Sequence, residues 1–89
     1  MTELNSPLSA PPNGVWTEEV GTITGELELR TRLNDDGQLT VQVRYAGALD
    51  WYTLRGGHTR LHDPRDHEPV HTLLVNVLNY PPVPVVEPN

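Results

Sequence analysis

The sequence predicts an α+β fold, in which an antiparallel β-meander of three or four strands carries one C-terminal helix packed on one face. Two patterns predict it. Over residues 23–45, apolar residues on odd positions alternate with polar residues, as in half-buried strands. Later in the chain, five apolar residues follow helical spacing: Val70, Leu73, Leu74, Val77 and Leu78. Because each pattern leaves one side polar, we expect the helix to cover the apolar side of the meander.

The 89 residues contain no internal repeat, and their number predicts a single domain, which we place at residues 15–80. Residues 1–14 hold three prolines and few apolar side chains, which favours a flexible, disordered N-terminal arm. Residues 81–89 are expected to form an extended or disordered Pro-rich tail. No apolar run approaches the roughly 18 residues of a membrane span. The start also lacks the basic and apolar regions of a signal peptide, so we expect a cytoplasmic location.

The first two strands are joined by the link NDDGQ, which suits a three-residue hairpin loop with Gly37 in the left-handed conformation. Pairing the residues on either side of this loop sets Leu29 opposite Val43 and Glu28 opposite Arg44. The loop chemistry and the apolar pattern give this register independently. The odd-numbered side chains should then face the helix, and the even-numbered ones should face away from it.

The segment LDWYTLR predicts a third strand. A two-residue turn at residues 47–48 would direct Tyr52 to the core and Trp51 outward, whereas a three-residue turn would exchange them. We favour the first alternative, because the two glycines at residues 56–57 then serve as a two-residue turn into a fourth strand, HTRLH. In either case one large aromatic side chain should lie on the outer face.

The helix can begin at Asp63-Pro64 or at Asp66, because a carboxylate stabilises the amino end of a helix and proline is tolerated in its first turn. It cannot continue beyond Tyr80, since the next two residues are prolines. We therefore expect the helix to close the domain.

Residues 67–71 read HEPVH, which matches the H-E-x-x-H signature of zinc proteases. In that signature two histidines one helical turn apart bind zinc, and the glutamate acts as general base. Pro69 restricts this segment to the first turn of a helix, and no histidine, aspartate or cysteine follows His71. We therefore interpret the match as accidental and expect no enzyme activity.

A metal site without catalysis is an alternative function. All four histidines lie within residues 58–71, and His62, His67 and His71 could converge where the last strand meets the helix. The chain has no cysteine, so a zinc ion would depend on imidazole and carboxylate ligands alone. The simpler interpretation is that the histidines are solvated or hydrogen-bonded locally, with no cofactor. A pH-sensitive patch is a related interpretation.

The polar face of the meander suggests the main functional hypothesis, a small non-catalytic protein-interaction or regulatory module. This face would carry one aromatic and five basic residues: Trp51, Arg30, Arg32, Arg44, Arg55 and Arg60. Tryptophan and arginine are enriched at the centres of protein interfaces, so we expect an acidic protein partner or a second copy of the chain to bind here. Single-stranded nucleic acid is a second alternative, which the formal net charge of −6 makes weaker.

Overall fold

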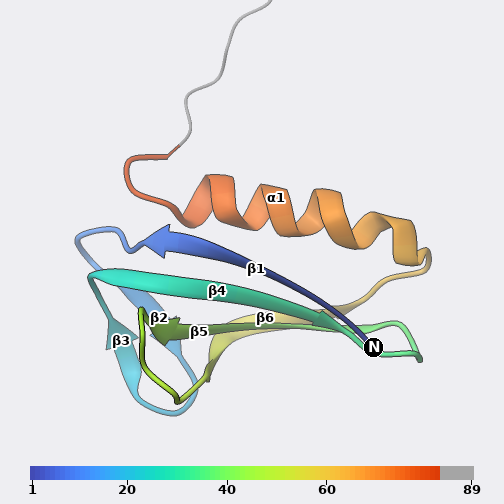
Figure 1. The fold of residues 1–89 in the computed structure, drawn as a ribbon, viewed down its shortest axis with the longest axis horizontal. Helices are drawn as coiled ribbons and strands as arrows, with labels where there is room; N and C mark the ends of the chain where they lie inside the picture. Colours follow the sequence, from blue (N-terminus) through green and yellow to red (C-terminus); the bar gives the residue numbers. More distant parts are fainter. Residues whose placement is uncertain (83–89) are drawn as a thin grey trace, which may run out of the picture.

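Within residues 1–82, six strands form one antiparallel sheet, and a single α-helix lies across one of its faces (Figure 1). The computed structural model describes residues 1–82. In order across the sheet, its strands are β1 (Thr2–Ser9), β4 (Glu26–Leu33), β5 (Gln38–Tyr45), β6 (Tyr52–Arg60), β2 (Val15–Thr17) and β3 (Gly21–Ile23). The predicted class, α+β with antiparallel strands and one C-terminal helix, is confirmed. The predicted number of three or four strands is too low, because the first 23 residues supply three strands of their own.

The predicted hairpin forms the centre of the sheet. β4 pairs with β5 in the expected register, with Leu29 opposite Val43. The Asn34 N–H donates to the Gln38 carbonyl over 2.9 Å, and Gly37 closes the loop with a φ of 92°. Because the apolar pattern and the loop chemistry demand the same pairing, this part of the fold follows directly from the sequence.

The predicted disordered N-terminal arm is wrong, because residues 2–9 form β1 and pair with β4 along their whole length. Leu8 belongs to the core and is 1% exposed. The Ala10 N–H donates to the Gly25 carbonyl, so even-numbered residues of β1 turn their backbone groups toward β4 and odd-numbered ones turn them outward. Pro7 is therefore on the outward side, where its missing N–H costs no ladder bond. An edge strand tolerates proline, and the composition of the segment did not distinguish it from a disordered one.

β2 and β3 form a short hairpin at the other end of the strand order from β1. Val15, Thr17 and Ile23 are buried, whereas Trp16 points outward and is 57% exposed. The predicted strand that begins at Ile23 is interrupted at Gly25, whose φ of 89° suits glycine. β3 therefore ends before β4 begins, and the two strands lie at different places in the sheet.

β6 is one continuous strand, so the predicted hairpin turn at residues 56–57 is wrong. Its pairing with β5 shifts in register between Thr40 and Gln42, because extra residues of β6 bulge out of the ladder. A Cβ on the second glycine of the bulge would lie 3.0 Å from the Cβ of Val41, so the two strands approach closely there. Before the bulge the even-numbered side chains of β6 lie on the helix side of the sheet, and after it the odd-numbered ones do. The predicted turn would have produced the same exchange.

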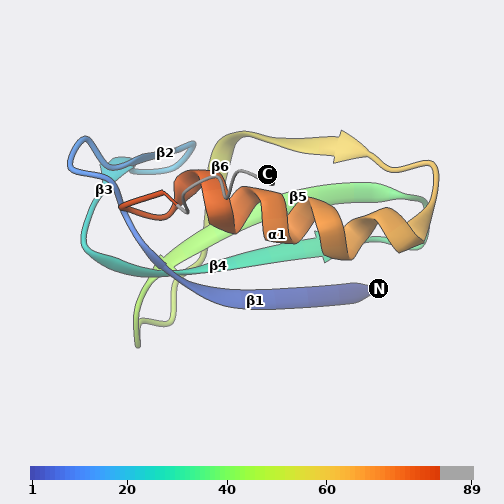
Figure 2. The ribbon, with the colours of Figure 1, turned by 90° about the horizontal axis from the view of Figure 1, so that it is seen from above.

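A short 3-10 segment, η1 (Pro64–Asp66), leads into the helix, α1 (His67–Leu78), which ends before the prolines as predicted. Seen from above, α1 crosses the sheet obliquely (Figure 2). It packs closest to β1 and β4, so the β5–β6 half of the same face is less covered.

The side of α1 that faces the sheet differs from the predicted apolar stripe. His67 and His71 are the buried residues of the helix, whereas Leu73 and Val77 are 59% and 58% exposed. Leu74 still packs against the core at the edge of this face. The helix is therefore rotated relative to the prediction, because the sheet offers the two imidazoles a buried hydrogen-bonding partner.

The core lies between α1 and the sheet and consists of aliphatic side chains: Leu8, Val15, Ile23, Leu27, Leu29, Val41 and Val43. Within residues 1–82, no helix is long and apolar enough to cross a membrane. The predicted Pro-rich tail lies outside the described residues from residue 83 onward.

Candidate functional site

Trp51 lies on the sheet face opposite α1, against two guanidinium groups. Arg30 Cζ is 4.0 Å and Arg44 Cζ is 4.5 Å from the centroid of the Trp51 ring. Both arginines alternate with buried residues of β4 and β5, so they point away from α1. Tyr52 packs against the core instead, which confirms the favoured orientation of the two aromatics. The attraction between a cation and such a ring is worth roughly 0.5–1 kcal/mol at an exposed site, so the three side chains hold one another in place.

The two arginines at this ring differ in how their charge is neutralised. Arg44 donates to both carboxylate oxygens of Glu28 over 3.2 Å. Arg30 donates from Nε and Nη2 to Gln42 Oε1 over 3.0 and 2.5 Å, and forms no ion pair within residues 1–82. Burial first, and the charge of Arg32 second, lower the pKa of Arg30, and the charge of Glu3 partly offsets them. Arg30 is therefore a cation that Gln42 and Trp51 contact and that forms no ion pair with a carboxylate of residues 1–82.

The other three predicted interface arginines lie farther along the sheet. Arg32 Nε is 3.1 Å from a carboxylate oxygen of Glu3. Arg55 Cζ is 5.7 Å from the ring centroid of Trp16, and Arg60 donates to a backbone carbonyl of the β4–β5 loop. The predicted residues thus form a central cluster, Arg30, Arg44 and Trp51, with three separate neighbours instead of one uniform patch. We call these three residues the Trp51 cluster.

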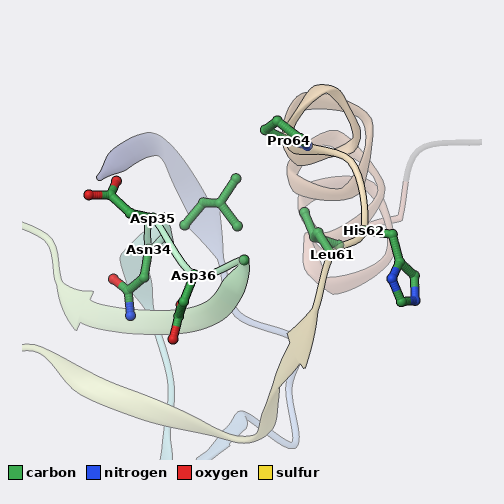
Figure 3. A pocket seen from close by; sticks show the side chains of 8 residues that line it. Asn34, Asp35, Asp36, Leu61, His62 and Pro64 are labelled. Atoms are coloured by element: carbon green, nitrogen blue, oxygen red, sulfur yellow. The ribbon is translucent and has the colours of Figure 1, made fainter.

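A hollow of about 210 Å³ lies between the β4–β5 loop and the segment that leads into η1 (Figure 3). Asp35, Asp36 and His62 are among its lining residues, but their side chains point away from one another. The N-terminal ammonium donates to the Asp35 carboxylate over 2.8 Å, and this hydrogen bond and charge lower the pKa of Asp35. Polar groups that diverge in this way do not form a set of ligands for one ion.

A second polar cluster is buried between α1 and the sheet. Thr31 Oγ1 lies 2.8 Å from His67 Nε2 and 2.7 Å from His71 Nδ1, and Ser6 Oγ lies 2.8 Å from His71 Nε2. Thr31 is 0% exposed, and both imidazoles are buried. We call these four side chains the histidine cluster. It connects α1 to β1 and β4, the two strands against which the helix packs.

The hydrogen bonds of the histidine cluster can run in one consistent direction. A neutral imidazole has one N–H donor and one acceptor nitrogen, and His67 Nδ1 is buried without a partner. A buried acceptor without a partner is tolerated better than a buried N–H, which places the His67 proton on Nε2. That group donates to Thr31, the Thr31 hydroxyl donates to His71 Nδ1, and His71 Nε2 donates to Ser6. Burial lowers the pKa of His71, and the nearby His67 lowers it further, so His71 is neutral at pH 7.

The HEPVH segment places its two histidines on one side of the helix, as the zinc signature does. His67 is the first residue of α1 and His71 follows one turn later. Both imidazoles converge on the Thr31 hydroxyl, while Glu68 and His62 are exposed. In the part of the chain that the structure describes, no group of three or more His, Cys, Asp or Glu side chains is placed to hold a metal ion. The structure thus brings together two of the three predicted zinc ligands and not the third.

Sequence reasoning missed two residues of the histidine cluster, Thr31 and Ser6, and the exposed Trp16 beside Arg55. Trp16 alternates with Val15 and Thr17, and this short alternation could have indicated an outward-facing aromatic residue. Thr31 occupies an odd position in β4 among leucines, which marked it as an inward-facing hydroxyl that needed a partner. Ser6 gave no signal, because its strand was predicted to be disordered.

Comparison with protein-family models, with curated proteins and with solved structures gave no match.

Proposed function

We propose that the chain is a non-catalytic interaction module that binds an acidic protein partner at the Trp51 cluster. The observation that carries the proposal is Arg30. It stacks 4.0 Å from the Trp51 ring, is held by Gln42, and has no carboxylate partner within residues 1–82. A carboxylate of a partner would supply the counter-charge.

The order of these side chains favours binding. An exposed arginine normally loses much side-chain entropy when a partner immobilises it, and this loss weakens binding. Gln42 and Trp51 already hold the Arg30 guanidinium, so less entropy remains to be lost. Tryptophan and arginine at the centre of a contact surface are the residue types that contribute most to protein binding.

An acidic partner is compatible with the acidic composition of the chain. The formal net charge is −6, but charges farther apart than about 8 Å are largely screened at physiological ionic strength. The local charge therefore governs recognition. A second copy of the chain is a weaker partner for this face, because a two-fold contact would bring the same arginines together.

The test is a titration of the full chain with a labelled synthetic peptide of alternating glutamate and glycine, followed by fluorescence anisotropy. Arg30→Gln should weaken binding by about tenfold, because a hydrogen bond to a charged group contributes roughly 1.5 kcal/mol or more. Trp51→Ala should also weaken binding, because it removes the ring that holds the Arg30 guanidinium. Arg65→Gln removes the same charge from a side chain that is 88% exposed and distant from the cluster, and serves as the matched control.

Equal weakening by Arg65→Gln and Arg30→Gln would show a general charge effect and would overturn the proposal. Light scattering and a labelled single-stranded oligonucleotide are run in parallel. A dimer that Arg30→Gln dissociates, or tighter binding of the oligonucleotide than of the peptide, would replace the acidic protein partner by self-association or by nucleic acid.

A further inference from the structure

One flank of the apolar stripe of α1 faces the β6 side of the sheet, while Leu74 and Leu78 pack against the core. Val70 and Leu74 line a groove of about 170 Å³, whose other wall is the β6 segment Gly56–Thr59 and whose floor includes Leu39 and Val41. Leu73 and Val77 continue the same flank of the helix and are exposed. The described residues therefore leave this side of the helix without a covering element.

The β6 wall of this groove is a free strand edge. The Leu61 N–H donates to the Gly37 carbonyl, so alternate residues of this part of β6 bond to β5, and His58 and Arg60 turn their backbone groups outward. β2 pairs with β6 only at Leu54, so no strand within residues 1–82 lies beside this segment. An extended chain placed here would find unpaired N–H and C=O groups.

The opposite edge of the sheet is blocked at the end of β1 that contains Pro7 and Ser9. Pro7 has no N–H to offer on the outward side of β1. The outward groups of Ser9 are already used, since its N–H donates to Asn79 Oδ1 over 2.8 Å and its carbonyl accepts from the Tyr80 N–H over 2.9 Å. Within residues 1–82, this end of the β1 edge is thus protected and the β6 edge is open.

Two cationic side chains lie beside the open edge. Arg55 and Arg60 lie in β6 on the face opposite α1, and neither forms an ion pair within the part of the chain that the structure describes. An added strand would alternate its side chains between this face and the groove. Acidic residues would suit the basic face, and apolar residues would suit the groove lined by Val70 and Leu74.

We infer that an extended peptide segment of a partner protein adds to the β6 edge, with apolar residues at alternate positions in the groove and acidic residues between them. This inference rests on the proposed function, that the partner is acidic, and assigns it a mode of binding. Peptides that add a strand to a sheet gain affinity from backbone hydrogen bonds and specificity from pockets for alternate side chains. A second copy of β6 fits less well, because two-fold pairing would bring the His58 and Arg60 side chains of both copies close together.

The probe is a synthetic seven-residue peptide in which valine and glutamate alternate. Its controls are a peptide with lysine in place of glutamate and a peptide of the same composition with the valines in one block. Only the first should bind with saturation, since the others lose either the charge or the alternation. Equal binding of all three peptides would overturn the inference.

Amide hydrogen exchange, followed by NMR on the full chain, gives a readout specific to strand addition. On binding, exchange of the His58 and Arg60 amides should slow by at least tenfold. Exchange of the Thr59 amide should stay unchanged, because that amide already faces β5. Protection without this alternation, or protection only near Trp51, would overturn the inference.

Val70→Asp should weaken peptide binding by about tenfold, because it places a charge in the groove opposite the apolar side chains. Thr72→Asp introduces the same charge at an exposed position on the other flank of α1 and should leave binding unchanged. If Arg30→Gln and Trp51→Ala abolish binding while Val70→Asp does not, the edge is excluded and the Trp51 cluster stands. If no acidic peptide binds, both proposals fail.

Discussion

The Trp51 cluster and the histidine cluster occupy opposite faces of one strand. Arg30 and Thr31 are neighbours in β4, yet the guanidinium contacts an open aromatic ring and the hydroxyl contacts two buried imidazoles. On the open face, water can replace any contact that is lost. Under α1 no water replaces it, so each hydrogen bond of the histidine cluster must be formed by the protein itself. Polar side chains one residue apart therefore contribute very differently to the free energy of unfolding.

The largest expected effect is the removal of the Thr31 hydroxyl. Thr31→Val keeps the volume but leaves His67 Nε2 and His71 Nδ1 without their shared partner. Each unsatisfied buried group costs roughly 1–3 kcal/mol, so we expect the free energy of unfolding to fall by about 2–4 kcal/mol. Urea denaturation monitored by tryptophan fluorescence measures it. The control is Thr40→Val, the same change on the half-buried opposite face in β5, and an equal loss there would contradict the assigned difference between the faces.

An intermediate loss of folding stability is expected at acidic pH. Burial first, and the nearby His67 second, lower the pKa of His71 from its ordinary value of 6.5. The unfolded chain therefore takes up a proton on this residue before the folded chain does, as the pH falls. Stability contributed by neutral His71 is complete above about pH 6.5 and is lost as the pH falls through the lowered pKa of the folded state.

The measurement is the urea midpoint between pH 7.5 and pH 5.5. His71→Gln should flatten its pH dependence, since glutamine does not titrate. His58→Gln replaces an exposed histidine and should leave the dependence as it is. Identical curves for the two variants would show that burial of His71 does not cause the acid sensitivity.

The smallest effect is expected at Trp51. Trp51→Ala removes two cation–π contacts, each worth roughly 0.5–1 kcal/mol at an exposed site, so the free energy of unfolding should fall by about 1–2 kcal/mol. Trp16→Ala removes a single contact of 5.7 Å to Arg55 and should cost less. If Trp51→Ala lowered the free energy of unfolding as much as Thr31→Val does, the open face would also stabilise the fold. Its side chains would then not serve binding alone.

Several features of the fold could be predicted because they depend on local chemistry. The hairpin around Gly37 combines a turn residue with period-two alternation, and the end of α1 is fixed by the following prolines. Strand parity required only that Trp51 and Tyr52 face opposite ways, because the turn at residues 56–57 that favoured Trp51 as the outer residue is not formed. β1 could not be predicted, because its eight residues contain little apolar side chain and its pairing with β4 brings together residues distant in the chain. The bulge in β6 depends in the same way on the close approach of Val41.

The sequence by itself determined the alternating face of the central hairpin, the end of the helix before the prolines and the placement of Arg30 away from the core. Each of these depends on neighbours within a few residues. Only the tertiary structure decided that His67 and His71 face inward, because their partners Thr31 and Ser6 lie more than 30 residues away. It also decided that the apolar stripe of α1 borders the open β6 edge, since the rotation of the helix depends on what the whole sheet presents beneath it.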